Sequence, residues 1–360
     1  MADTPQNHRA RRTKLSDVAL KAGVSAVTVS RVLRRPEMVS AELRGRVEKA
    51  VRDLAYIPNR AASALASART HTIGAVVSSL TNGVFADYLR ALHDVFLPAG
   101  FQVLVLNSRY SPAEEERAIA TLLGQHPEAM ILAGVDQTAH ARHLLERSGV
   151  PVVQTMELAD DPIDINIGLS QRAAGHAATR FLIDLGHRRI GAIAARLDAR
   201  SRSRAEGYRR AMVEAGLDTE GLVAMTPRRS SVALGAELLR EVLSRAPELE
   251  ALFCCNDDLA LGVLFECARL GIAVPGRMSI VGFNDLEFAA SAYPSLTSVA
   301  TPRYEMGRQA AEILLEIIRG SGMRPPSRRI DLGFAIHRRD STQARLETVA
   351  LRLPSLEVSP

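Results

Sequence analysis

Apolar and polar positions near the start of the chain alternate with the period of a helix. The apolar positions recur at steps of three and four residues, as they do on one face of an amphipathic helix. They are Leu15, Val18, Ala19 and Ala22. Gly23 follows, and glycine at that place terminates helices because it adopts the left-handed conformation without strain. The sequence therefore predicts a short helix that ends at Gly23.

The next stretch, AVTVSRVL (26–33), alternates valine with serine and threonine, as a half-buried strand would. Val29, Val32 and Leu33 nevertheless restore the steps of three and four residues, and Ser25 suits the N-cap of a helix. We therefore expect a second helix. Its outer face carries Val27, Thr28 and Arg31. A helix, a tight turn containing glycine and a second helix are together typical of the helix-turn-helix motif that reads DNA.

A third helix is predicted from Ser40 to about Ala55, with Ser40 at its N-cap and Glu42 in its first turn. One apolar stripe runs along it. The stripe consists of Leu43, Val47, Ala50, Val51 and Leu54. Three short helices can share one small core. The Ala-rich stretch NRAASALAS (59–67) that follows is too short to hold a helix by itself in water.

From Thr72 onward, short apolar runs alternate with helical segments, which is typical of βαβ units and parallel sheets. The runs include TIGAVV, QVLVL, AMILAG, PVVQT, RIGAIA, ALFCC and MSIVGF. They form two groups, before and after about residue 168. We therefore expect a small all-α helix-turn-helix headpiece followed by an α/β part of two doubly wound parallel-sheet lobes. A ligand cleft is expected where the carboxyl ends of the strands face each other.

The charge of the chain is concentrated at its start. Residues 1–70 hold 14 Lys and Arg against 6 Asp and Glu, a balance of +8, whereas the other 290 residues hold 31 against 34, a balance of −3. A local excess of this kind is the electrostatic pattern expected for binding the phosphate backbone of DNA. A solvated basic tail is the alternative, and the helix-turn-helix pattern argues against it.

Other features of the sequence argue against membrane insertion and metal chemistry. The first twelve residues are polar and basic, and no run approaches the roughly 18 apolar residues of a membrane span, so we expect a cytoplasmic protein that does not bind membranes. The three cysteines lack CxxC spacing and lie in apolar segments, which favours reduced core thiols. They are Cys254, Cys255 and Cys267. We expect no metal site and no cofactor.

Enzyme chemistry is also disfavoured. No G-x-G-x-x-G motif occurs in the α/β part. The only lysines of the chain are Lys14, Lys21 and Lys49, so a P-loop or a Schiff base in the large domain is excluded. We find no convincing Ser/His/Asp or metal constellation. A two-lobed sugar-binding receptor of a transporter, without a regulatory role, remains the alternative, although the DNA reader and the missing signal peptide argue against it.

Several segments in the expected order resemble the lactose and galactose repressor family of bacterial transcription regulators. They include LSDVALKAGVSAVTVSRVL, VSAELRGRVEKAVRDLAYIPNRAASAL, LIDLGHRRIGAI, LFCCNDDLALGVL and MSIVGFNDLEFA, and the resemblance covers roughly residues 13–340. Within the family, RPEMVSAELRG, SSLTNGVFADYLR and ARLDARSRSRAEGY look most like the gluconate-operon repressors. The resemblance implies a homodimeric repressor that binds a pseudo-palindromic operator and is released by a small effector.

The family pattern also implies the division of the chain. A headpiece at 13–58 is followed by a hinge helix and linker at 59–71, and then by an effector-binding and dimerisation domain at 72–340. The first lobe is expected to consist of about 72–168 and 300–330, and the second of about 169–299 and 331–340. The tail, 341–360, contains leucines without a heptad pattern, so we expect no coiled coil there.

The resemblance implies which residues contact DNA. In the second helix, Ala26, Val27 and Arg31 match positions that face base edges, and Arg can bind guanine O6 and N7 bidentately. Positions near phosphates or in support of the helix are Ser25, Thr28 and Ser30. In the hinge, Leu65 matches a leucine that wedges into the minor groove, Ala62 allows two hinges to approach closely, and Asn59 is a possible cap. An ordinary Ala-rich linker is the alternative for the hinge.

The resemblance also places effector residues in the cleft. They are Ser79, Asn82 and Phe85 from the first lobe and Arg204, Asn256 and Asn284 from the second. The family more often has Asp at position 284, and loss of that negative charge suits an anionic ligand. Positive potential nearby is expected from Arg196, Arg200 and Arg202, unless these side chains are merely solvated. The expected effector is a sugar acid, gluconate or a relative, acting as inducer.

Overall fold

The computed structural model describes residues 13–58, 69–320 and 328–345. The chain forms two compact units, residues 1–70 and 71–360, which are described separately below.

The first unit, the headpiece, is built from short helices around one apolar core. Helix α1 (Leu15–Ala22) ends at Gly23, which has a φ of +66°. Helix α2 (Ala26–Arg34) begins after Ser25, whose hydroxyl accepts the backbone N–H of Thr28 at 3.1 Å. A 3-10 turn (Pro36–Met38) leads to α3 (Ala41–Asp53), which ends two residues before the predicted boundary. Ser40 precedes α3 as predicted, but its side chain makes no capping hydrogen bond.

The core of the headpiece collects the predicted apolar faces of its helices. Its buried members are Val18, Ala19, Ala22, Val29, Val32, Val47, Ala50 and Tyr56. The valines of α2 that carry the helical spacing are therefore buried, whereas the serines and threonine of the same stretch are not. The strand-like alternation of this segment thus belongs to a helix that packs on its neighbours.

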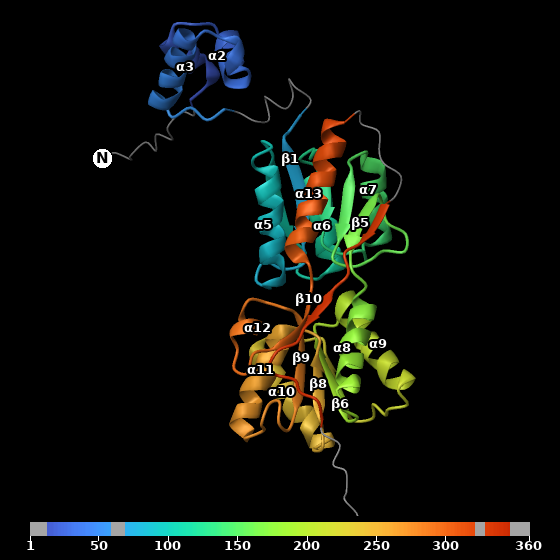
Figure 1. Cartoon of the computed structure of the whole chain (residues 1–360). Coiled ribbons are helices and arrows are strands. Elements are labelled where there is room, and N and C mark those ends of the chain that lie inside the picture. Colours follow the sequence, from blue (N-terminus) through green and yellow to red (C-terminus); the bar gives the residue numbers. More distant parts are fainter. Residues whose placement is uncertain (1–12, 59–68, 321–327, 346–360) are drawn as a thin grey trace, which may run out of the picture. The chain divides into compact units, whose positions relative to one another are not determined.

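The second unit contains two six-stranded sheets (Figure 1). The first lobe holds a wholly parallel sheet in the order β11-β5-β4-β3-β1-β2. Its strands are β1 (Thr72–Val77), β2 (Gln102–Asn107), β3 (Ala129–Leu132), β4 (Val152–Thr155), β5 (Ile165–Gly168) and β11 (Arg328–Asp331). Its helices are α5 (Val84–Phe96), α6 (Pro112–Leu123), α7 (Ala139–Ser148) and α13 (Arg303–Arg319).

The second lobe repeats this arrangement in the order β12-β10-β9-β8-β6-β7. Its strands are β6 (Ile190–Ala195), β7 (Val223–Thr226), β8 (Ala251–Cys254), β9 (Ser279–Asn284), β10 (Thr297–Ala300) and β12 (Ala335–His337). Its helices are α8 (Gln171–Asp184), α9 (Ala199–Glu214), α10 (Val232–Arg245), α11 (Asp257–Leu270) and α12 (Phe288–Ser291). Its pairs are parallel except for β10 with β12, which is antiparallel and was not predicted.

The chain crosses between the lobes three times: after β5, after β10 and after β11 (Figure 1). In each sheet the strand order reverses next to one strand, β1 in the first lobe and β6 in the second. Crevices for ligands form outside the carboxyl ends of strands at such reversals. The loops that follow β1 and β6 therefore lie where a ligand site is expected.

The described part of the chain also bears on the cysteines and on membrane insertion. All three cysteines are buried and unpaired, and burial raises the pKa of the Cys255 thiol to about 12. No helix among the described residues is long and apolar enough to cross a bilayer. Those residues also contain no cluster of three or more His, Cys, Asp or Glu side chains that could hold a metal ion.

Candidate functional site

The start of α2 presents a face that points away from the headpiece core. Val27 is 67% exposed, and Ser25, Ala26 and Arg31 are exposed with it. Thr28 and Ser30 are partly buried. The guanidinium of Arg31 makes no ion pair or hydrogen bond within the described residues. An exposed arginine beside small apolar side chains matches the donors and methyl contacts that the major groove of DNA accepts.

Two residues of this face also stabilise the helix. The hydroxyl of Ser25 lies 2.9 Å from that of Thr28 and accepts the N–H of Thr28. Arg46 of α3 donates to the carbonyl of Ala22 at 2.7 Å and so caps the end of α1. The sequence alone did not indicate this role of Arg46. The headpiece thus fixes the angle between α1 and α2 through caps at both sides of the turn.

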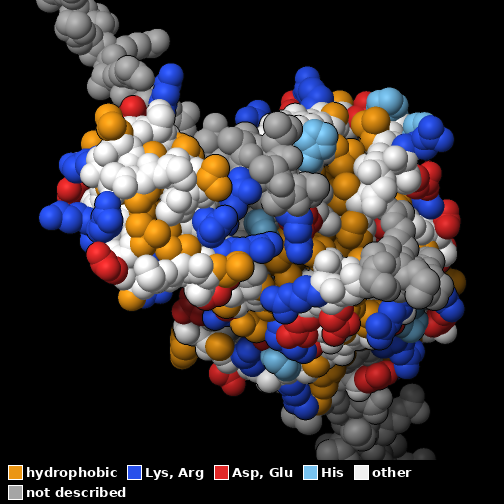
Figure 2. All heavy atoms as spheres, turned by 90° about the horizontal axis from the view of Figure 1, so that it is seen from above, with side chains coloured by type: hydrophobic (Ala, Val, Ile, Leu, Met, Phe, Trp, Pro, Cys, Tyr) orange, Lys and Arg blue, Asp and Glu red, His pale blue; other side chains and the backbone are white. Residues whose placement is uncertain are grey.

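Cations stand out from the surface of the headpiece, as Figure 2 shows. Lys14, Lys21 and Lys49 are all exposed there, and Lys21 pairs with Asp53 at 3.2 Å. Surface pairs of this kind add little stability, so these amines remain available to phosphates. The predicted hinge residues Asn59, Ala62 and Leu65 lie outside the described residues.

In the second unit, a pocket between the lobes collects most of the predicted effector residues. It encloses about 340 Å³, its open mouth included. Its lining consists of Asn82, Val84, Phe85, Tyr110, Arg196, Asp198, Arg200, Ser201, Arg204, Asn256 and Asn284. Five of the six predicted residues are in this set. The sixth, Ser79, lines a neighbouring cavity, and its hydroxyl accepts the N–H groups of Thr81 and Asn82 at 3.1 Å.

Arg204 is the most deeply buried cation of the pocket, with 6% of its surface exposed. Its Nε donates to Gln171 Oε1 at 2.7 Å, and its Nη1 donates to the carbonyl of Cys255 at 2.7 Å and to Asn256 Oδ1 at 2.9 Å. The guanidinium also lies 3.8 Å from the centre of the Phe283 ring. All four partners are neutral, and burial lowers the pKa of Arg204 to about 10.

No carboxylate of the described chain forms an ion pair with Arg204, and its Nη2 has no hydrogen-bond partner there. A buried charge is costly unless an opposite charge or several hydrogen bonds compensate it. The neutral partners fix the direction of the guanidinium and leave one nitrogen without a partner. Asp198 and Glu157 interact with its charge electrostatically but do not pair with it. The site therefore suits an anionic group on the ligand.

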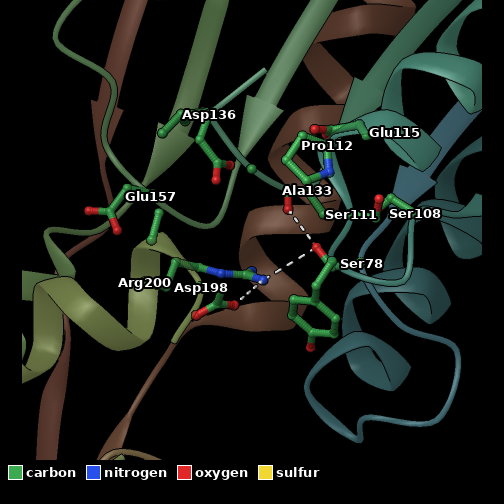
Figure 3. A pocket seen from close by; sticks show the side chains of 14 residues that line it. Ser78, Ser108, Ser111, Pro112, Glu115, Ala133, Asp136, Glu157, Asp198 and Arg200 are labelled. Carbon is green, nitrogen blue, oxygen red and sulfur yellow. Dashed lines mark hydrogen bonds and ion pairs between the residues drawn. The ribbon is translucent and has the colours of Figure 1, made fainter. Parts of the chain in front are cut away.

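Arg200 crosses the cleft from the start of α9. Its Nη2 donates to Ser78 Oγ of the first lobe at 3.3 Å and lies 3.4 Å from Asp198 Oδ2, as the dashed lines in Figure 3 show. Burial by itself would raise the pKa of Asp198, but Arg200 and the N–H of Ser201 hold it below its usual value. Arg196 stacks on the Tyr110 ring, 3.9 Å from its centre.

The arginines expected near the cleft thus have different environments. Arg196 and Arg200 line the pocket, whereas Arg202 is exposed to solvent. Tyr110, Asp198 and Ser201 also line it, although the sequence did not single them out. Asp198 carried a usable signal, because it is an Asp at the N-cap of α9 and its Oδ1 accepts the N–H of Ser201 at 2.9 Å.

The two asparagines of the second lobe differ in what they offer. Asn256 is engaged on both sides, since its Oδ1 accepts from Arg204 and its Nδ2 donates to Ser230 Oγ at 3.2 Å. The side chain of Asn284 makes no hydrogen bond to the described residues, although the residue is only 3% exposed. Its backbone has a φ of +110°, an uncommon conformation for any residue but glycine. Asn284 therefore has a free amide at the pocket.

A second cavity adjoins the pocket at Tyr110, Asp198 and Arg200, and it has an acidic wall (Figure 3). The acids that line it are Glu115, Asp136, Glu157 and Asp198. Burial raises the pKa of Glu157 to about 7, and it also raises the pKa of Glu115. The Oε1 of Glu157 accepts the N–H of Gln171 at 3.3 Å, while its Oε2 is buried without a partner among the described residues.

The headpiece and the two-lobed unit are each matched by a known family. The sequence profile of the bacterial regulatory proteins, lacI family, matches residues 14–59, and that of the periplasmic binding protein-like domain matches residues 179–342. The HTH-type transcriptional regulator GntR of Pseudomonas aeruginosa is 44% identical over 332 residues, which cover 92% of this chain and 96% of that protein. This chain belongs to the LacI family.

Solved structures agree with that assignment. The transcription regulator GntR from Chromobacterium violaceum is 42% identical. The match covers 75% of this chain and 99% of that chain, with a TM-score of 0.72. The lac repressor dimer bound to operator and the anti-inducer ONPF is 26% identical. That match covers 93% of this chain and 100% of the repressor chain, with a TM-score of 0.79. The predicted resemblance and fold class are confirmed.

The protein is a DNA-binding transcriptional repressor of the LacI family and not an enzyme. Repressors of this family bind operator DNA and small sugar effectors, and they function as dimers. The alternative of a transport receptor without a regulatory role is wrong, because the regulatory headpiece itself matches the family.

Proposed function

We propose that a sugar acid, gluconate or a close relative, binds between the two lobes and releases this LacI-family repressor from its operator. The observation that carries the proposal is Arg204, a buried guanidinium with neutral partners and one unengaged nitrogen. A ligand carboxylate brings an opposite charge into direct contact with the guanidinium and accepts hydrogen bonds from this planar donor.

The charge of the whole pocket supports an anionic ligand. Three arginines line it, Arg196, Arg200 and Arg204, against a single acid, Asp198. Asn284 is neutral, so it adds no repulsion, and its free amide can donate to a hydroxyl or to a carboxylate oxygen. Phe85 provides an apolar wall for a carbon chain.

Release from DNA would follow from closure of the lobes around the ligand. Two arginines of the second lobe already bond the loop after β1 in the first lobe: Arg200 binds Ser78, and Arg229 Nη2 donates to Thr81 Oγ1 at 2.7 Å. A ligand that strengthens this closed arrangement favours one placement of the lobes over others. Ligand and operator then prefer different states and weaken each other reciprocally.

For DNA, we propose that Ala26, Val27 and Arg31 contact base edges and that Ser25, Thr28 and Ser30 lie near phosphates or support the helix. The exposure of this face supports the assignment. For the hinge, the family resemblance supports a minor-groove wedge at Leu65, close approach of two hinges at Ala62 and a cap at Asn59.

Isothermal calorimetry of the purified repressor tests the ligand. Gluconate is expected to bind, whereas glucose and ribose, which lack the carboxylate, bind much more weakly. Arg204→Gln should weaken gluconate binding about 10- to 100-fold, because it removes a charge-assisted contact. The matched control is Arg202→Gln, on the same helix but exposed to solvent, which should bind gluconate like the wild type.

Release is measured with a fluorescent operator in an anisotropy titration. Saturating gluconate should lower operator affinity about 5- to 150-fold, the usual range for coupled sites. If gluconate and related acids give no heat while a neutral pentose binds and releases the DNA, the proposal is wrong.

A further inference from the structure

Arg303 connects the two lobes at the edge of the effector pocket. It is the first residue of α13 in the first lobe and is 9% exposed. Its Nη2 lies 3.2 Å from Asp87 Oδ2 on α5, the other helix packed beside it (Figure 1). The same guanidinium reaches the second lobe, where it donates to the carbonyls of Asn284 and Asp285, the latter at 3.3 Å.

The segment that Arg303 holds is a strained one. Asn284 and Asp285 have φ values of +110° and +54°, in a region that is unfavourable for residues other than glycine. Such a conformation persists only when its surroundings impose it. Two backbone N–H groups of the segment donate here, that of Asp285 to Ser298 Oγ at 3.1 Å and that of Leu286 to Asp257 Oδ2 at 2.7 Å. Thr301 Oγ1 also donates to the carbonyl of Asn284 at 3.5 Å, and the carboxylate of Asp285 pairs with His337 and Arg339.

The partners of these two N–H groups belong to the second lobe itself, whereas Arg303 belongs to the first lobe. Asn284 is also the residue whose side chain lines the pocket without a partner of its own. The direction of its amide therefore depends on a main-chain conformation that an arginine of the opposite lobe helps to impose.

We propose that Arg303 is a positioning residue for effector binding: anchored to the first lobe by Asp87, it holds the main chain of Asn284 and Asp285 so that the Asn284 amide points into the pocket. This inference rests on the proposed effector site. It makes the placement of Asn284 depend on the relative position of the lobes, which is the variable that the effector changes.

The first test compares gluconate binding by calorimetry in the wild type and in Arg303→Gln. The variant should bind gluconate about tenfold more weakly, because hydrogen bonds from a charged donor to the strained loop are lost. The matched control is Arg308→Gln, on the same helix, where the arginine pairs with Glu305 and Glu312 and with no other acid among the described residues. It should bind gluconate like the wild type.

A double-mutant cycle separates positioning from a general structural role. Asn284→Gly removes the amide, and glycine adopts a φ of +110° without strain. In that background, Arg303→Gln should weaken gluconate binding no further, because there is no amide left to position. If the full tenfold loss persists in the Asn284→Gly background, Arg303 does not act through Asn284 and the proposal is overturned.

Hydrogen exchange provides a readout that needs no ligand. In Arg303→Gln, the backbone amides of residues 285 and 286 should exchange faster, while those of strand β9 before them keep their protection. Exchange at these amides like that of Arg308→Gln would overturn the proposal. Failure of the wild type to bind gluconate would instead contradict the proposed function, and the exchange result would still decide the role of Arg303.

If Arg303→Gln does not fold, Asp87→Asn carries the same two measurements. It removes the ionic anchor in the first lobe and leaves the contacts of Arg303 with the second lobe in place. Weaker gluconate binding together with faster exchange at residues 285 and 286 supports the proposal. No change in either contradicts it.

Discussion

At Glu157, burial decides the charge state of a carboxyl group next to the effector pocket. Its pKa is raised to about 7, and it accepts the N–H of Gln171, whose side chain in turn binds Arg204. Below pH 7 the carboxyl is therefore mostly neutral, and above pH 7 it is mostly an anion that competes with a ligand carboxylate for the positive charge of Arg204.

We therefore expect gluconate to bind more tightly at pH 6 than at pH 8. The carboxylate of gluconate stays ionised over this range, so the change comes from the protein. Glu157→Gln should bind gluconate with nearly the same affinity at both pH values, as calorimetry in matched buffers can show. A wild-type affinity that is flat from pH 6 to 8, or that rises with pH, would contradict this role of Glu157.

The same carboxyl should make stability depend on pH. Because its pKa is higher in the folded protein, its contribution is fully present below about pH 4.5 and is lost as pH rises through about 7. Measured by thermal unfolding, Glu157→Gln should become more stable relative to the wild type as pH increases from 5 to 8. A constant difference between the two proteins would argue against a raised pKa.

Arg31 carries the sharpest prediction for DNA. Arg31→Ala should weaken operator binding by about 1–3 kcal/mol and relax the preference at one base pair of each half-site. Anisotropy titrations with operators substituted at single positions measure both effects. Arg34→Ala, at the far end of the same exposed helix, is the comparison for a loss of positive charge alone. Equal losses on every operator sequence would indicate a phosphate contact instead.

The family resemblance predicted six effector residues, and five of them line one pocket in the structure. The sequence did not point to Tyr110, which follows β2 and lines the pocket from the first lobe. It also did not point to the acidic wall that contains Glu157. These contacts depend on how loops of two separate sheets meet, and no local pattern encodes that. The unusual φ of Asn284 was equally invisible, since nothing in its neighbours requires it.

At the scale of elements, the packing of α8 on α9 places Arg204. The two helices approach so closely that a Cβ added at Gly175 would lie 2.3 Å from the carbonyl oxygen of Arg204. The same helix pair uses Gly207, where an added Cβ would lie 2.1 Å from the carbonyl oxygen of Arg172. Small residues at these contacts set the distance between the helices and so the depth of the arginine.

Gly175→Ala should therefore lower stability by about 1–3 kcal/mol through overpacking, and it should also weaken gluconate binding because α9 must move. Thermal unfolding and calorimetry measure the two effects. The comparison is Gly45→Ala in α3, where an added Cβ meets nothing within 4 Å and should be neutral or stabilising. A Gly175→Ala protein with wild-type stability and affinity would show that the helices can separate at no cost.

Elements with strong local signals were predicted well. Gly23 ends α1, and the hydroxyl of Ser25 caps α2. Strand β12 was not predicted because it has only three residues and no alternating pattern, and its antiparallel pairing comes from the route of the chain between the lobes. Local chemistry thus sets the ends of helices, whereas the path of the chain sets the edge of the second sheet.

At the scale of the whole molecule, dimerisation follows from the family and determines the form of the operator. One headpiece per chain supplies one recognition helix, so two chains are needed for two half-sites. Footprinting should show a short symmetric site with half-sites about one helical turn apart. Protection of a single asymmetric half-site by a monomer would contradict this prediction.

The distribution of lysine has a practical consequence. All three side-chain amines of the chain, Lys14, Lys21 and Lys49, are exposed on the headpiece, and the two lobes contain arginine as their only strong base. A reagent that acylates amines would therefore modify side chains of the DNA-binding unit and spare those around the effector pocket. Acylation removes the positive charge of each lysine, so it should reduce operator affinity without changing gluconate binding. The same selectivity allows a fluorophore to be attached to a headpiece lysine, close to bound DNA, without any change to the amino-acid sequence.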